Sequence, residues 1–228
     1  MPALFITATG TDVGKTFVTT GLIRALRQHG RKVTALKPIG TGIDAENFAA
    51  SDAALLLEAC GRGVDLDAIA AISPWRFTAP LSPDMAAAEE GRTIDVSAVR
   101  HFCTNAMAEA EDVSLIEGIG GLMVPLDARS TVCDLIVALK IPTILVAGTY
   151  LGSLSHTLTA LEVAQKRDLH IAVLVLNETK NSTVKIEATR NSLSHFWKGP
   201  IVTIPHNALD ASAFVQLMEF LPPASSVA

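Results

Sequence analysis

Gly14, Lys15 and Thr16 stand together near the start of the chain, and this tripeptide is typical of a loop that binds phosphate. The full pattern has a further glycine at the position where this chain has Thr9. An apolar run precedes the tripeptide and an amphipathic stretch follows it, so the strand and helix that flank such loops are both expected. In that setting backbone N–H groups surround the phosphates, Lys15 reaches the β and γ oxygens, and the Thr16 hydroxyl ligates Mg²⁺.

Three more residues with useful chemistry stand where strands end or a helix begins. Lys37 ends an apolar run, and it is either a solvated strand-end lysine or a cation aimed at the same edge as Lys15. Glu117 ends another apolar run before a glycine turn, and it either ligates Mg²⁺ or accepts hydrogen bonds from backbone donors. Asp52 begins a helix-like stretch, and from the residues alone the favoured role is to cap or charge that helix start. Ligands of open α/β sheets bind at the carboxyl ends of strands, so we expect these side chains to converge there.

The elements that must position these residues alternate along the chain. Short apolar runs read as strands buried on both faces, which is typical of a parallel sheet covered by helices. We therefore predict a single doubly wound, mainly parallel α/β sheet flanked by helices, similar to a P-loop NTPase, in one domain over residues 1–228. Pro83 is expected in a loop or at a strand end. The expected strands are 4–8, 33–37, 113–118, 143–148, 172–177 and 201–204, and the expected helices are 15–30, 51–61, 96–111, 153–167 and 182–197.

Composition narrows the functional classes. The net charge of -5 comes with no lysine or arginine run, which argues against nucleic-acid binding. The apolar runs are far shorter than the roughly 20 residues that a membrane-spanning helix needs. The first residues show no export leader, so a cytoplasmic location is expected. Cys60, Cys103 and Cys133 are widely spaced, which predicts reduced core thiols and no zinc site.

Six motifs, read together, resemble the dethiobiotin synthetase family. They are GTDVGKT (10–16), KPIGTG (37–42), SDA (51–53), SPWRFTAPLSPDMAAAEEG (73–91), IEGIGGLMVPL (116–126) and YLGSLSH (150–156). They occur in the family's order at compatible separations, and the resemblance runs from about residue 4 to residue 178. It implies a P-loop ligase domain that closes a cyclic urea on 7,8-diaminononanoate with CO₂ and ATP. The products would be dethiobiotin, ADP and phosphate, formed through a carbamate and a carbamic-phosphoric anhydride.

The resemblance also implies roles for individual residues. Lys37, Lys15 and Thr11 form the implied catalytic set, in which the lysines stabilise charge as the carbamate attacks the γ-phosphorus. Thr16, Asp52 and Glu117 would surround Mg²⁺, and Asn177 would read the adenine base. The implied contacts to nucleotide and metal are Asp12, Val13, Gly14, Lys15, Thr16, Phe17, Asp52, Glu117, Gly118, Gly120 and Asn177.

The resemblance places the organic substrate between two regions of sequence. Thr41 and Gly120 would contact the diamine or its carbamate. Leu151, Gly152 and Ser155 lie in a segment that, in the family, binds the substrate carboxylate with helix N-terminal amides across a dimer interface. A helix that begins near Ser153 could do so through its dipole. The implied partners are therefore small-molecule substrates and a second copy of the chain, in a homodimer.

The sequence departs from the family pattern at several positions. Ala8 aligns with the usual first glycine of the loop, and Asp12 replaces a longer glutamate. Asp84 stands where a histidine is common. The loop that follows Pro205 lacks the glycine that commonly precedes this proline, so we assign no nucleotide contacts to it.

Other functional classes stay open at this point. A partner-regulating switch ATPase of the same P-loop class usually carries a second lysine early in the loop, and residues 9–11 contain none. An amidoligase of cobalamin assembly would need an additional glutamine-hydrolysing domain, for which the chain has no room. A non-catalytic nucleotide-binding module would bind ATP without diamine-dependent turnover.

Overall fold

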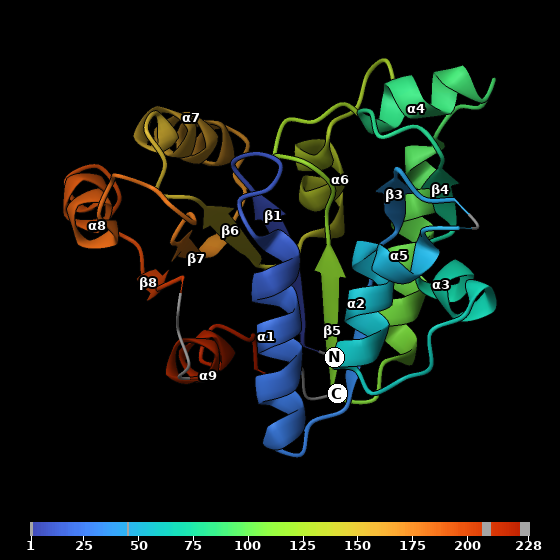
Figure 1. Ribbon diagram of the computed structural model, residues 1–228, viewed down its shortest axis with the longest axis horizontal. Coiled ribbons are helices and arrows are strands. Elements are labelled where there is room, and N and C mark those ends of the chain that lie inside the picture. The colour runs from blue at the N-terminus through green and yellow to red at the C-terminus, as the bar shows by residue number, and fades with distance from the viewer. Residues whose placement is uncertain (1, 45, 207–210, 224–228) are drawn as a thin grey trace.

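A wholly parallel sheet forms the centre of the computed structural model, which describes residues 2–44, 46–206 and 211–223 (Figure 1). Its strand order is β2-β5-β1-β6-β7-β8, so the N-terminal strand lies inside the sheet. This arrangement confirms the predicted doubly wound parallel sheet. The strands are β1 (Ala3–Ala8), β2 (Val33–Leu36), β5 (Val113–Glu117), β6 (Thr143–Ala147), β7 (Ile171–Asn177) and β8 (Ile201–Ile204).

Helices cover both faces of this sheet. On one face α1 lies between α2 and α9, as Figure 1 shows. The other face is covered by α5 to α8, with α5 packed on β5 and α8 on β7 and β8. The helices of the first face are α1 (Lys15–Gln28), α2 (Asp52–Ala59) and α9 (Ser212–Met218). Those of the second are α5 (Val96–Glu109), α6 (Val132–Leu139), α7 (Ser153–Lys166) and α8 (Ile186–Ser194).

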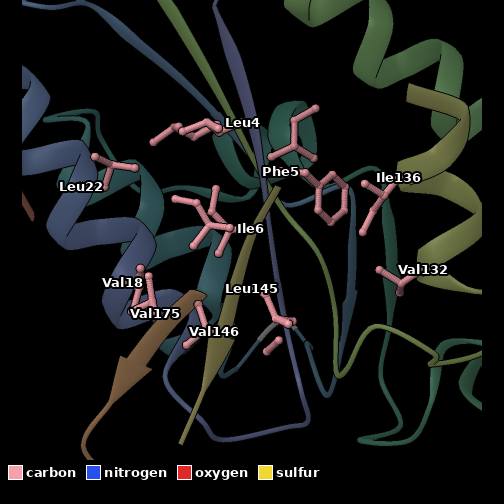
Figure 2. Close-up of a cluster of buried hydrophobic side chains, with 14 of the residues drawn as sticks. Leu4, Phe5, Ile6, Val18, Leu22, Val132, Ile136, Leu145, Val146 and Val175 are labelled. Atoms are coloured by element: carbon pink, nitrogen blue, oxygen red, sulfur yellow. The ribbon is translucent and has the colours of Figure 1, made fainter. Parts of the chain in front are cut away.

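The core explains why the strands read as continuous apolar runs. Every residue of β1 is buried, and its successive side chains point to opposite faces of the sheet. In Figure 2, Leu4 and Ile6 point toward Leu22 of α1, while Phe5 points toward Ile136 of α6. Both faces are therefore packed, and neither tolerates the polar alternation of a half-exposed strand.

The structure contains short elements that the sequence did not reveal. Two three-residue strands, β3 (Ile39–Thr41) and β4 (Trp75–Phe77), pair in parallel beside the main sheet. Besides α6 and α9, the unforeseen helices are α3 (Leu66–Ile72) and α4 (Pro83–Glu89). Pro83 was expected in a loop or at a strand end, but it begins α4, because proline's fixed φ and missing N–H suit the first helical position.

Element ends differ modestly from the expected ones. The six predicted strands are all present, with ends shifted by at most one residue. The helix predicted over 182–197 spans only Ile186–Ser194. The loop after Pro205 is described only in part, because residues 207–210 lie outside the described residues. Within the described ranges, no helix is long and apolar enough to cross a bilayer.

The three cysteines are free, as predicted. Cys103 and Cys133 are buried, whereas Cys60 is partly exposed. Burial raises the pKa of the Cys103 thiol to about 12. Cys103 and Cys133 are therefore core side chains.

Candidate active site

A pocket of about 970 Å³ opens at the edge of the sheet where β1, β2 and β5 end. The phosphate loop and the first turn of α1 form one side of it. The segment after β3 and the segment that leads into α4 form another. The lining residues are Thr11, Asp12, Gly14, Lys15, Thr16, Phe17, Lys37, Gly40, Thr41, Gly42, Ile43, Asn47, Ala50, Ser51, Asp52, Pro80, Leu81, Ser82, Pro83, Ile119, Gly120 and Val124.

The phosphate loop turns between β1 and α1 through two residues with left-handed backbone. Asp12 has φ of 59° and Gly14 has φ of 96°. A Cβ atom on Gly14 would lie 2.1 Å from Asn177 Nδ2, which donates a 3.0 Å hydrogen bond to the carbonyl of Val13. A side chain at position 14 would therefore force Asn177, at the end of β7, to shift.

Four side chains from different elements meet beside this loop. Thr16 Oγ1 lies 2.8 Å from both Asp52 Oδ1 and Glu117 Oε1, so its single proton can be donated to either carboxylate. Lys37 Nζ lies 2.7 Å from Asp52 Oδ2 and 2.7 Å from Glu117 Oε1. Lys37 also donates to the carbonyl of Gly118 at 2.9 Å. The structure thus brings Thr16, Lys37, Asp52 and Glu117 together.

These contacts decide two of the open interpretations. Lys37 is 2% exposed, so it is not a solvated strand-end lysine. The N-cap of α2 is Ser51, whose side chain accepts from the amide of Ala54. Asp52 therefore does not cap the helix, although it is the acidic residue of the first turn and can still charge the helix start. Its carboxylate also reaches Thr16 and Lys37.

Burial and charge perturb the titration of these groups. Burial, with the neighbouring Lys37 charge adding to it, lowers the pKa of Lys15 to about 8. Burial also opposes charge on Lys37, but Glu117 and Asp52 outweigh it and raise the pKa of Lys37 above its ordinary value. For Asp52, burial opposes ionisation, yet Lys37 and Thr16 hold the pKa below its ordinary value. The site therefore holds Asp52 as a carboxylate and Lys37 as an ammonium.

The oxygens of Thr16, Asp52 and Glu117 are also of the kind that binds Mg²⁺. Glu117 is fully buried, and its Oε2 has no hydrogen-bond partner within the described part of the chain. Mg²⁺ prefers oxygen ligands and usually takes only one or two carboxylates, with substrate phosphates and waters completing the shell. No cluster of three or more His, Cys, Asp or Glu side chains suited to a metal occurs among the described residues. The residues present fit an ion that arrives with a nucleotide.

The remaining predicted site residues divide into three groups, the third being the segment at the start of α7. Thr11, Asp12, Phe17, Thr41 and Gly120 line the pocket. Three others lie beside it: Val13 and Asn177 support the loop through their hydrogen bond, and Gly118 accepts from Lys37.

The segment expected to bind the substrate carboxylate lies outside the pocket. Leu151 is 90% exposed, and Gly152 and Ser155 are exposed at the start of α7, which begins at Ser153 as predicted. Nearby, Tyr150 and His156 share a 2.7 Å hydrogen bond between Oη and Nδ1. A single chain does not bring this segment into the pocket with Thr41.

Several lining residues were not identified as site residues from the sequence. They include Ile43, Asn47 and the segment 80–83. The segment 80–83 lies within the motif FTAPLSP, and Ile43 directly follows KPIGTG, but neither motif gave these residues a role. Asp84, at the position where a histidine is common, accepts a 2.6 Å hydrogen bond from the Ser82 hydroxyl.

Sequence comparison identifies close relatives of this chain. A family model described as an AAA domain matches residues 2–209. The ATP-dependent dethiobiotin synthetase BioD of Acidiphilium cryptum is 47% identical over 194 residues, covering 85% of this chain and 87% of that protein. The BioD protein of Phenylobacterium zucineum is 41% identical over 226 residues, covering 96% of this chain and 95% of that protein.

Solved structures show a related fold at low sequence identity. The MinC:MinD cell division complex of Aquifex aeolicus aligns with a TM-score of 0.56 at 14% identity, over 95% of this chain and 86% of that chain. The cell division ATPase MinD of Pyrococcus furiosus gives 0.54 at 18% identity, over 96% and 98%. At these identities the likeness shows the P-loop fold alone, so it does not favour the switch-ATPase alternative. The sequence relatives, matched over most of their length, show that the chain belongs to the ATP-dependent dethiobiotin synthetase family.

Proposed function

We propose that the protein carboxylates 7,8-diaminononanoate with CO₂ and ATP and closes the product to dethiobiotin, releasing ADP and phosphate. This is ligase chemistry of biotin biosynthesis, in keeping with the family to which the chain belongs. One observation carries the proposal: a buried Lys37, held between Asp52 and Glu117, lines the same pocket as the phosphate loop and Thr41. The pocket thus offers a triphosphate site and an organic-substrate site side by side.

The reaction needs no nucleophile from the protein. One substrate amine adds to CO₂ and loses a proton, giving a carbamate. A carbamate oxygen attacks the γ-phosphorus, the bond from that phosphorus to its bridging oxygen breaks, and ADP leaves. The second amine then attacks the carbonyl carbon of the carbamic-phosphoric anhydride. Phosphate leaves with that amine's proton, and the cyclic urea closes.

The chain's contribution is positioning and charge neutralisation, which dominate catalysis of phosphoryl transfer. In this proposal the amides from Thr11 to Thr16 hold the triphosphate, and Lys15 reaches its β and γ oxygens. Lys37 offsets the charge that develops between carbamate and phosphorus. Thr41 and Gly120 orient the diamine.

Thr16, Asp52 and Glu117 would hold Mg²⁺, which neutralises the β- and γ-phosphates when bound. Asn177 keeps its Nδ2 on the carbonyl of Val13, which leaves the amide oxygen to accept from the exocyclic amine of adenine. Gly118 and Gly120 would complete the nucleotide side.

The exposed position of Leu151, Gly152 and Ser155 supports a homodimer in which this segment serves the partner's pocket. The α7 N-terminus would then bind the substrate carboxylate. We further propose that residues 1–228 act as one P-loop ligase domain and that the enzyme works in the cytoplasm, without nucleic-acid or membrane partners.

The test is ADP release from Mg-ATP and bicarbonate, with and without 7,8-diaminononanoate. The organic product is analysed by mass spectrometry for one added carbonyl in place of two hydrogens. We expect ADP release to require the diamine and to match the product mole for mole. ADP release indifferent to the diamine would indicate a switch ATPase, and ATP binding without turnover would indicate a nucleotide-binding module.

A further inference from the structure

Side chains that do not line the pocket fix the position of the pocket wall opposite the phosphate loop. This wall, residues 80–83, lies between the end of β4 and the start of α4. The residues that lead into it are bonded to the β3 segment: the amide of Gly42 donates to the carbonyl of Ala79 at 3.1 Å, and the amide of Ile43 donates to the carbonyl of Phe77 at 3.0 Å. Any shift of β4 therefore moves the wall and the β3 segment together.

Thr41 depends on the same pairing. It lies opposite Phe77 in the parallel register of β3 and β4. The two strands have only three residues each, and their sheet contains no further strand within the described residues. So small a sheet needs outside support to keep a fixed position.

Glu90 provides the first part of that support. Its Oε1 accepts a 2.8 Å hydrogen bond from the amide of Thr78 and a 3.1 Å bond from the Thr78 hydroxyl. These bonds, with Arg92 adding to them, lower the pKa of Glu90, so the group is a carboxylate at neutral pH. Thr78 directly follows β4, so Glu90 fixes the point from which the wall departs.

Arg92 provides the second part. Its guanidinium carbon lies 4.4 Å from the centroid of the buried Phe77 ring, and its Nη1 donates to the carbonyl of Arg76 at 3.0 Å. The same nitrogen lies 2.8 Å from Glu90 Oε2. A guanidinium is suited to such a role because its plane can stack on a ring while its edge donates.

The turn at the end of α4 brings this pair back to β4. Gly91 has φ of 64°, and the amide of Arg92 donates to the carbonyl of Ala87 at 2.8 Å. The chain from Arg76 to Arg92 thus closes on itself, with the wall and α4 inside the closed loop. Neither Glu90 nor Arg92 lines the pocket.

We propose that Glu90 and Arg92 are positioning residues for the organic substrate, acting through Thr78 and Phe77 on the wall and on Thr41. This inference rests on the proposed function, in which Thr41 faces the diamine. The phosphate loop lies on the other side of the pocket and makes none of these bonds. The pair therefore affects diamine binding and leaves nucleotide binding alone.

Steady-state kinetics with purified full-length variants test the proposal. For Glu90→Ala we expect the KM for 7,8-diaminononanoate to rise about tenfold, since small misplacements of positioning groups cost one to two orders of magnitude. The Kd for Mg-ATP should stay within about twofold. Glu90→Gln keeps an acceptor oxygen for Thr78, so its KM for 7,8-diaminononanoate should stay close to the wild-type value. Arg92→Lys loses the stack on Phe77 and should raise the KM by an intermediate factor. Such splits between KM and nucleotide Kd are not expected from general destabilisation.

Glu162→Gln is the matched control, because Glu162 forms an exposed ion pair with Lys166 at 3.1 Å on α7 and lies outside the pocket lining. A wild-type diamine KM in Glu90→Ala overturns the proposal, as does an equal loss of diamine and nucleotide affinity. Hydrogen exchange of the ligand-free protein gives a second measurement, in which the Thr78 amide should exchange faster in Glu90→Ala. If the Thr78 amide exchanges at the wild-type rate in Glu90→Ala, Glu90 does not hold the end of β4, and this result does not depend on the identity of the substrate. If the wild-type enzyme shows no diamine-dependent turnover, the proposed function is wrong and the positioning role falls with it.

Discussion

Replacement of Lys37 by methionine would remove the ammonium from the centre of the site while keeping most of the side chain's length. Three acceptors would lose the lysine donor: Asp52 Oδ2 and Glu117 Oε1, each 2.7 Å from Lys37 Nζ, and the carbonyl of Gly118 at 2.9 Å. Glu117 is fully buried, so water cannot replace the lost partner without rearrangement. Two neighbouring carboxylates would then repel each other.

The expected cost follows from this burial. Removing one partner of a buried ion pair typically destabilises a protein by about 3–5 kcal/mol. The Asp52 side chain is 46% exposed, so solvent screens part of its charge, and we expect a value near the lower end, about 3 kcal/mol. That is a large share of the roughly 5–15 kcal/mol that stabilises a typical domain.

Urea denaturation at pH 7.5, with EDTA or with MgCl₂, measures this loss. Mg²⁺ should recover part of it in Lys37→Met, because a divalent cation can replace the ammonium between the two carboxylates. Lys15→Met is the matched control. Burial already lowers the pKa of Lys15 to about 8, and its contact with the carbonyl of Gly10 is a long 3.5 Å, so its removal should change stability by less than about 1 kcal/mol.

The reasoning fails if Lys37→Met loses no more stability than Lys15→Met. It also fails if MgCl₂ stabilises the Lys37 variant no more than the wild type. Turnover adds a separate check, since Lys37→Gln should lower it by orders of magnitude while Mg-ATP binding survives. Near-normal turnover in that variant would remove the lysine from the mechanism.

Two further predictions concern the phosphate loop. The free protein loses the Lys15 ammonium as pH rises through about 8, so Mg-ATP binding should take up a proton there and its Kd should rise by up to tenfold per pH unit above it. Calorimetry in two buffers of different ionisation enthalpy checks this, and a flat Kd from pH 7 to 9.5 would contradict it. The pKa of Lys15 in the folded protein, about 8, lies below its unfolded value of 10.5. Loss of the Lys15 proton therefore raises the free energy of unfolding as pH rises from about 8 to 10.5. Gly14→Ala should destabilise the fold by at least about 2 kcal/mol, since the added Cβ meets Asn177 at 2.1 Å on left-handed backbone. In thermal unfolding, Gly30→Ala should lose only about 1 kcal/mol, because its φ is also positive but nothing lies within 4 Å; equal losses would refute the steric argument.

The main sheet was predictable because its strands are buried on both faces. Strands such as β1 and β6 carry no polar alternation, and each is followed by a recognisable turn or helix. The helix α6 was missed because its sequence, VCDLIVAL, is as short and apolar as a buried strand. Its capping box between Thr131 and Asp134 was the available signal.

The convergence of Lys37, Asp52 and Glu117 was predictable in part because two of them end neighbouring parallel strands. The support of the phosphate loop by Asn177 was not, because that contact joins residues 164 positions apart and leaves no local pattern. The pocket wall was missed for a similar reason. Its place depends on the pairing of β3 with β4, and three-residue strands are too short for periodicity to show.

The central place of β1 has a consequence for folding. This first strand pairs with β5 and β6, which begin at Val113 and Thr143. At ribosomal rates of roughly 5–20 residues per second, a nascent β1 waits on the order of ten seconds for both neighbours. During that time six residues that end up buried remain without their sheet partners, and such non-local pairing is slow even in the complete chain. The phosphate loop follows this strand and Glu117 ends β5, so nucleotide binding can begin only after these long-range pairings have formed.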